Sequence, residues 1–89
     1  MFSLSYTAGE HLAYMLAMAN APEDAVIRFA RDGDGFDLGI DRVRPGDTTF
    51  DHLEKVVLAI DEQVSELLAD MKLDVKVTGE LVLIEQPEE

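Results

Sequence analysis

Residues 26–43 read VIRFARDGDGFDLGIDRV, and this stretch decides the fold. Two apolar segments, Val26–Arg31 and Phe36–Val43, flank the pair Gly33-Asp34. Glycine in the first place of a two-residue loop is typical of the primed turns that join antiparallel strands. The stretch therefore predicts a β-hairpin that turns at Gly33-Asp34.

The register of this hairpin follows from its apolar residues. Pairing around the turn places Ile27 opposite Ile40 and Phe29 opposite Leu38, with all four side chains on one face. A slip of one residue would break both pairs and turn these side chains to the other face. We therefore expect this face of the hairpin to lie on the core.

The opposite face of the hairpin carries charge. The same register places Arg28 near Asp37 and Asp41, which predicts exposed ion pairs. Such pairs contribute about 1 kcal/mol or less to the stability of a protein.

The segment before the hairpin predicts a strand followed by a helix. Apolar and polar residues alternate over residues 2–6, as in a half-buried strand. Thr7 and Glu10 have the spacing of a capping box, in which each side chain accepts a hydrogen bond from the other residue's amide. A helix is therefore expected over about Ala8–Ala19, ended by the segment Asn20–Pro22. Its expected core stripe consists of Leu12, Met15, Leu16 and Ala19.

The same helix has a second apolar region. Tyr14 and Met18 lie off the core stripe, in the turns that follow His11. They are either the margin of a wide buried face or a surface for self-association, because an apolar second face needs cover. The sequence leaves both interpretations open, and the second predicts a homo-oligomer formed through Tyr14 and Met18.

The rest of the chain predicts further strands and one more helix. Arg44–Asp47 has Pro and Gly at the centre of a type II turn, and Asp61 can cap a helix. The stripe of that helix consists of Val64, Leu67, Leu68 and Met71. The additional strands are expected over residues 48–53, 56–60, 73–78 and 81–84, with a turn at Gly79. The chain is thus expected to be mainly β with two helices, an α+β fold.

Length and charge limit the organisation and the partners of the chain. Its 89 residues predict one domain over residues 1–89, in which residues 86–89 form a frayed tail. The formal net charge is −12. We therefore expect neither nucleic acid nor a membrane as partner, because their phosphates attract Lys and Arg. Such acidity fits a solvated surface, a basic protein partner or a saline cytoplasm.

The chain contains no cysteine. It can form no disulfide and offers no thiolate to a metal, a composition that fits the reducing cytoplasm. Asp32, Asp34 and Asp37 are weak candidates for a metal site, because carboxylates are ligands for hard cations. A solvated turn explains the same residues, since Asp and Gly are standard turn residues.

The sequence contains no catalytic motif. His11 and His52 are distant in the chain and are expected to be surface or rim histidines. Ser3, Ser5 and Ser65 belong to no nucleophile motif, and no glycine-rich phosphate loop follows a strand and opens a helix. An enzyme is therefore not expected, and no cofactor is predicted.

Four segments of the chain, taken in order, resemble a known family. They are LSYTAGEHLAYML (4–16), VIRFARDGDGFDLGID (26–41), KVVLAID (55–61) and LDVKVTGELVLIEQP (73–87). Gly35, Phe36 and Gly39 fill the places of a glycine, an aromatic residue and a further glycine in the family's central hairpin. Together the segments resemble the HesB-like family, the A-type (IscA-like) iron–sulfur cluster carriers and scaffolds. The resemblance implies a fold of short mixed β-sheets, packed as a sandwich or pseudo-barrel and flanked by two helices.

The resemblance does not extend to the metal ligands. The family is expected to hold iron or a cluster through three cysteines, one in the central hairpin and two in a Cys-Gly-Cys tail. The hairpin position falls at Gly33 or Asp34 here, and the sequence ends at Glu89 without that tail. Since iron–sulfur clusters are held mainly by thiolates, the family's ligands carry over to no residue of this chain.

Two functional hypotheses follow. The first is a non-enzymatic HesB-like protein without cluster binding, which acts by binding a protein partner or a second copy of itself. The second is an accessory protein of iron–sulfur assembly, which binds iron weakly through carboxylates or pairs with a cysteine-bearing family member.

Overall fold

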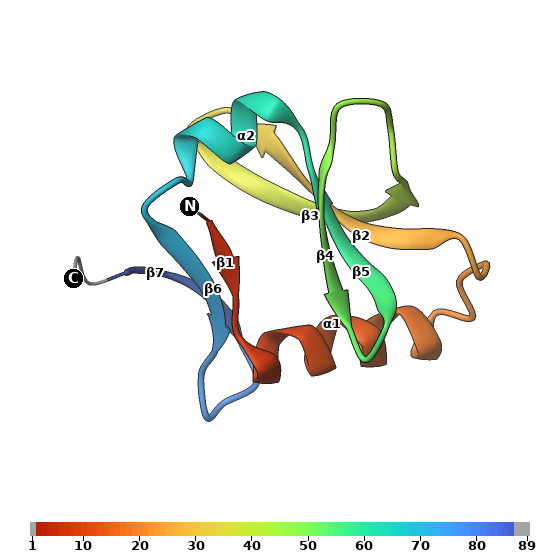
Figure 1. Cartoon of the computed structure of the whole chain (residues 1–89). Helices are drawn as coiled ribbons and strands as arrows, with labels where there is room; N and C mark the ends of the chain where they lie inside the picture. Colours follow the sequence, from red (N-terminus) through yellow and green to blue (C-terminus); the bar gives the residue numbers. More distant parts are fainter. Residues whose placement is uncertain (1, 87–89) are drawn as a thin grey trace.

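Two short β-sheets share one core in the computed structural model of the chain, which describes residues 2–86 (Figure 1). The strands are Ser3–Leu4 (β1), Ala25–Asp32 (β2), Gly35–Arg42 (β3), Thr48–His52 (β4), Lys55–Ile60 (β5), Met71–Val75 (β6) and Leu81–Glu85 (β7). The helices are Tyr6–Met18 (α1) and Glu62–Leu67 (α2). The expected fold class, mainly β with two helices, is confirmed.

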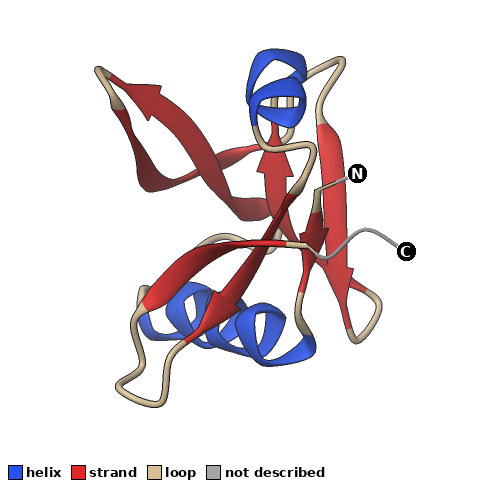
Figure 2. Cartoon of the chain, turned by 90° about the vertical axis from the view of Figure 1, so that its left-hand side faces the viewer, coloured by secondary structure: helices blue, strands red, loops and turns tan. Residues whose placement is uncertain are grey.

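Both sheets are mixed, as the resemblance implies. The larger sheet has the strand order β3-β2-β5-β4, with β2 and β5 parallel and the two outer pairs antiparallel. The smaller sheet has the order β1-β6-β7, with β1 parallel to β6. α1 packs against strands of both sheets, and α2 lies at the opposite end of the molecule (Figures 1 and 2).

The core fills the space between the sheets and α1. Its fully buried large side chains come from α1, β2, β5, α2 and β6, so every layer contributes to it. They are Leu12, Ile27, Leu58, Ile60, Leu73, Val57 and Val64.

The central hairpin has the predicted register. Ile27 lies opposite Ile40 and Phe29 opposite Leu38, and Gly33 turns the chain with a left-handed φ of 59°. Only the β2 half of this face is buried, however, because β3 is the outer strand of the sheet. Leu38 is half-buried and Ile40 is exposed.

α1 begins earlier than the predicted capping box. Ser5, not Thr7, is the N-cap, and its Oγ accepts a hydrogen bond from the Ala8 amide at 3.0 Å. The same hydroxyl donates to Oδ1 of Asp74 in β6 at 2.8 Å, a contact that no local pattern can indicate. Tyr6 therefore belongs to the helix and not to the first strand. The expected stripe also ends one residue too late, because Ala19 is an exposed C-cap residue.

α2 has the predicted cap but is shorter than expected. Oδ1 of Asp61 accepts the Val64 amide at 2.7 Å, which confirms the N-cap. Val64 is buried, whereas Leu67 is largely exposed and Met71 already opens β6. Neither helix within residues 2–86 is long and apolar enough to cross a membrane.

The charged face of the hairpin differs from the prediction. Arg28 is buried and pairs with Asp47, in the loop between β3 and β4, instead of forming exposed pairs with Asp37 and Asp41. Both guanidinium Nη atoms donate to the two carboxylate oxygens of Asp47, the Nη2–Oδ1 bond at 3.0 Å. The side chains are only 10% and 2% exposed. The pair is therefore a bidentate, nearly dry ion pair.

Asp47 also closes its own loop. Its amide donates to the Arg44 carbonyl at 3.1 Å, and its Oδ2 accepts the Arg44 amide at 2.7 Å. Gly46 has a φ of 87°, as the predicted type II turn requires. One carboxylate thus joins a turn to the centre of the sheet.

We expect Arg28→Met to destabilise the fold by about 3–5 kcal/mol, because it leaves the buried Asp47 carboxylate without a counter-ion. Urea unfolding followed by circular dichroism measures the loss. Arg42→Met is the matched control: its pair with Asp24 spans 3.2 Å, but the side chains are 72% and 63% exposed. Its loss should be about 1 kcal/mol or less, and equal losses in the two variants would contradict the assignment.

Stability should also depend on pH through Asp47. The Arg28 hydrogen bonds, followed by the Arg44 amide, hold the pKa of Asp47 below its ordinary value of 3.8 against the opposing effect of burial. A lowered folded-state pKa gives stability that is complete above pH 3.8 and is lost as the pH falls below it. We therefore expect Asp47→Asn to be less stable than wild type at pH 7, with a difference that shrinks below pH 3.8. A difference that is constant with pH would contradict this.

Candidate functional site

The three aspartates at the hairpin tip are not gathered into one cluster, nor with other metal-ligating side chains of residues 2–86. Asp32, Asp34 and Asp37 are all exposed, and Oδ1 of Asp37 accepts the Leu38 amide at 3.1 Å. Within residues 2–86, no group of three or more His, Asp or Glu side chains lies close enough together to hold a metal ion. The position of the family's hairpin cysteine, Gly33 or Asp34, is the exposed tip itself. Carboxylate binding of a metal there stays a prediction.

An apolar cleft separates the outer strands of the two sheets. It measures about 260 Å³. Its lining comes from β2 and β3 on one side and from β6 and β7 on the other, and it consists of Phe29, Phe36, Leu38, Leu73, Leu81, Val82 and Leu83. The rings of Phe29 and Phe36 meet edge to face, with centroids 5.8 Å apart. The cleft is thus lined by apolar side chains that are far apart in the sequence.

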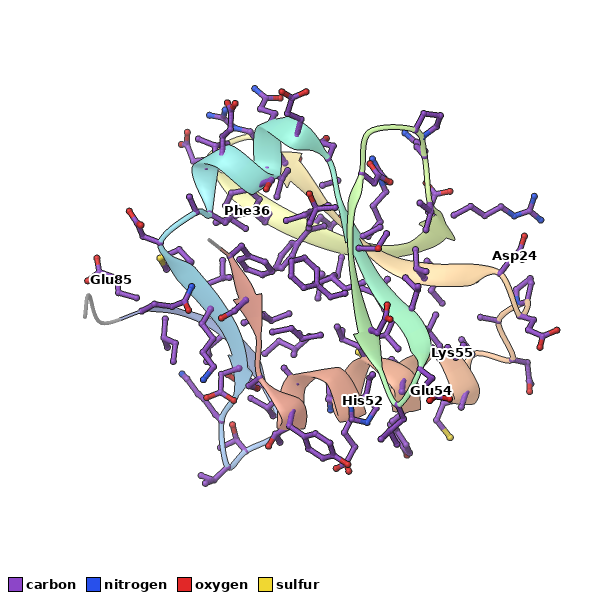
Figure 3. The ribbon with its side chains drawn as sticks, viewed as in Figure 1. Asp24, Phe36, His52, Glu54, Lys55 and Glu85 are labelled. Atoms are coloured by element: carbon purple, nitrogen blue, oxygen red, sulfur yellow. The ribbon has the colours of Figure 1, made fainter. Side chains whose placement is uncertain are left out.

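A larger cavity of about 700 Å³ lies near the start of β2 and the β4–β5 turn. Its rim carries both signs of charge, and Figure 3 shows Asp24, Glu54 and Lys55 on the same side of the molecule. Arg42, also on the rim, is already paired with Asp24. No buried side-chain polar atom within residues 2–86 lacks a hydrogen-bond partner. The other charged side chains of the lining are Glu23, Glu54 and Lys55, so acidic groups outnumber basic ones around the cavity.

The second apolar region of α1 is exposed. Tyr14 is 60% and Met18 66% exposed, so the pair is not the margin of a buried face within this chain. The helix has few polar residues to solvate this side, namely Thr7, Glu10 and His11. A helix that is apolar on two sides is expected to be covered on both.

Two further exposed apolar residues lie on α1 or on the turn beside it, and the sequence did not single them out. Tyr6, at the start of α1, is exposed, and its ring lies 4.8 Å from the ring of His52. Leu53 follows His52 at the β4–β5 turn and is 74% exposed. We call Tyr6, Tyr14, Met18 and Leu53 together the α1 surface.

His52, expected to be a surface or rim histidine, is 9% exposed and belongs to the buried polar residues. It lies beside α1 (Figure 3), and a Cβ added to Gly9 would come within 2.9 Å of its Nδ1. The absence of a side chain at Gly9 thus makes room for the imidazole. Leu53 and Glu54, which turn the chain after His52, have left-handed φ values of 50° and 69°. Asn and Gly are the usual residues in such a turn, so the conformation is strained.

The comparisons with known proteins agree with this architecture. No model of a known protein family matches the chain, and no curated protein matches its sequence. Among solved structures, the chain is similar to the crystal structure of SufA from Escherichia coli, which is described as involved in the biosynthesis of iron–sulfur clusters. The two are 18% identical, with a TM-score of 0.68 over 96% of this chain and 83% of SufA. The chain therefore has the fold of SufA: short mixed sheets flanked by two helices.

Proposed function

We propose that this chain is a non-enzymatic HesB-like protein that is related to iron–sulfur cluster biogenesis but binds no cluster itself, and that it acts by contacting other proteins. The observation that carries the proposal is the combination of the SufA fold over 96% of the chain with a sequence that contains no cysteine. The fold supports the relationship, and the composition supports the loss of cluster chemistry.

The ligand chemistry supports the loss of cluster binding. Iron–sulfur clusters need soft thiolate ligands, and the chain offers only hard carboxylates and two imidazoles. At the hairpin tip the candidate carboxylates are exposed, where water competes for a metal. A protein with this fold and without thiolates lacks cluster ligands but still has surfaces through which it can bind other proteins.

The α1 surface supports action through protein contact. Its four members are large apolar side chains that the chain does not cover within residues 2–86. Tyr and Met are enriched at interfaces, where they provide contact area with adaptable shape. We propose that a second copy of the chain, or another protein, covers this surface.

We expect the purified protein to stay colourless after anaerobic incubation with ferrous iron and sulfide. The reason is the absence of thiolate ligands, and the measurement is the visible absorbance spectrum with iron and acid-labile sulfide analysis. A ferredoxin treated in parallel is the positive control. Stoichiometric iron and sulfide with a brown colour would contradict the proposal, and iron bound without sulfide would favour the carboxylate hypothesis.

If a second copy covers the α1 surface, self-association should increase with salt. The net charge of −12 opposes the approach of two copies, and about 1 M salt screens this repulsion without weakening apolar contact. Sedimentation equilibrium should show a mass that rises above 9.9 kDa as salt is added.

The double variant Tyr14→Ser with Met18→Ser should remain monomeric at every salt concentration. Val77→Ser is the matched control, because Val77 is fully exposed in the β6–β7 turn and lies outside the α1 surface. A wild-type protein that is monomeric throughout, or a double variant that associates as wild type does, would rule out self-association through α1.

A further inference from the structure

β3 has an unpaired outer edge. It is an outer strand of the four-stranded sheet, so one edge pairs with β2 and the other with no strand of residues 2–86 (Figure 2). Alternate amides of an antiparallel strand point to opposite edges. The Leu38 amide donates to Oδ1 of Asp37 at 3.1 Å, and the Arg42 amide donates to Oδ1 of Asp41 at 2.8 Å. These two amides therefore point outward, and each is capped by the side chain of the residue before it.

The other two outward amides of β3 have no such cap. Because the period of a strand is two residues, the amides of Phe36 and Ile40 point the same way as that of Leu38. The residues that precede them are Gly35 and Gly39, which have no side chain to accept the hydrogen bond.

Gly39 is not required by the fold. A Cβ added there would meet no atom within 4 Å, and its φ lies outside the left-handed region. Gly39 instead affects the edge of the sheet. Because glycine has no side-chain acceptor, the outward amide of Ile40 is not capped by the residue before it. In this edge strand, capped and bare amides thus alternate along one line.

The side chains beside this edge form an apolar cleft that can accommodate side chains of a bound peptide. Phe36 and Leu38 point into the apolar cleft, where Leu81 and Leu83 of β7 form the facing wall. At about 260 Å³ the cleft is smaller than the roughly 300–1,000 Å³ typical of small-molecule sites, and it suits single side chains better than a whole ligand. A strand that paired with β3 would direct every second side chain into it.

The other face of the same edge is acidic. Asp37 and Asp41 lie there, Asp41 in an exposed ion pair with Arg44 at 2.7 Å, and the net charge of the whole chain is −12. The remaining side chains of an added strand would project beside these carboxylates. Lys or Arg in those positions would therefore be favoured, and Asp or Glu disfavoured.

From these observations we infer a docking site: the outer edge of β3 binds an extended segment of another protein, in which apolar residues alternate with Lys or Arg. The segment adds to the larger sheet as a fifth strand, its apolar side chains fill the cleft, and its cations meet Asp37 and Asp41. This inference concerns a surface separate from α1 and does not depend on whether the chain self-associates.

A second copy of this chain fits the edge poorly. It would bring its own Asp37 and Asp41 and a further charge of −12 to an already acidic edge, and like charges across paired strands are destabilising. The Asp caps fit this distinction, because charged residues on an exposed edge keep identical chains from pairing. A basic segment can draw the carboxylates away from the Leu38 and Arg42 amides and take over those hydrogen bonds.

The test uses three synthetic eight-residue peptides and the whole protein. The first alternates Lys and Val, the second alternates Glu and Val, and the third has the composition of the first with four Lys followed by four Val. Isothermal titration should show binding of the first peptide only, because charge alone without alternation cannot fill the cleft. NMR spectra should show the largest amide shifts at residues 36–42.

Variants at Gly39 test the edge itself without changing the charge. Gly39→Asn supplies a side-chain oxygen that can cap the Ile40 amide as Asp37 caps Leu38, and it should weaken binding about tenfold, the equivalent of one or two backbone hydrogen bonds. Gly39→Ala adds a Cβ without an acceptor and should bind as wild type does. Urea midpoints of both variants check that the fold is kept.

Several results would overturn the inference. They are equal binding of the alternating and grouped Lys–Val peptides, amide shifts centred on α1, or wild-type affinity in a correctly folded Gly39→Asn. No detectable binding of the alternating peptide would also overturn it. If in addition the solution mass of the protein falls in Gly39→Asn, the edge pairs with a second copy instead.

Discussion

The bidentate pair between Arg28 and Asp47 holds the β3–β4 connection against the centre of the larger sheet. The chain leaves β3 at one edge and re-enters as β4 at the other, so the connection between them must pass β2 and β5. Arg28, in β2, holds the carboxylate of Asp47 on this path, and Asp47 in turn closes the Arg44 turn. Replacing a buried pair by apolar residues is often neutral or stabilising in other proteins. The contribution of this pair is therefore best understood as fixing one route for the connection.

Local patterns predicted the elements whose determinants are themselves local. The hairpin register follows from two apolar pairs, and the caps at Asp61 and the turn at Gly46 follow from side chains within a few residues. The errors arose where distant contacts decide. Ser5 displaces Thr7 as N-cap with the help of Asp74, and Arg28 finds its partner in a loop rather than across the hairpin.

The candidate surfaces also combine residues that local patterns predict with residues that only distant contacts bring together. Tyr14 and Met18 could be named from helical periodicity, whereas Leu53 joins them only because the β4–β5 turn lies beside α1. Gly39 leaves an amide accessible only because β3 is an outer strand, and a sequence pattern does not reveal which strand is outermost. In the sequence, Gly35 and Gly39 stand out only through the resemblance of the hairpin to that of the HesB-like family. In the structure they also determine where the backbone of an edge strand is accessible.

The short parallel pair between β1 and β6 has a consequence for the synthesis of this protein. Ser3 and Leu4 pair with Lys72 and Leu73, so β1 has no strand partner until the ribosome has released β6. Until then α1 also lacks β6, one of the strands that covers its buried side. The β2–β3 hairpin needs only its own residues and can form early. The β1–β6 pair joins residues that are far apart in the chain, and such contacts form slowly. On the nascent chain, the side of α1 that β6 covers therefore stays exposed until β6 emerges.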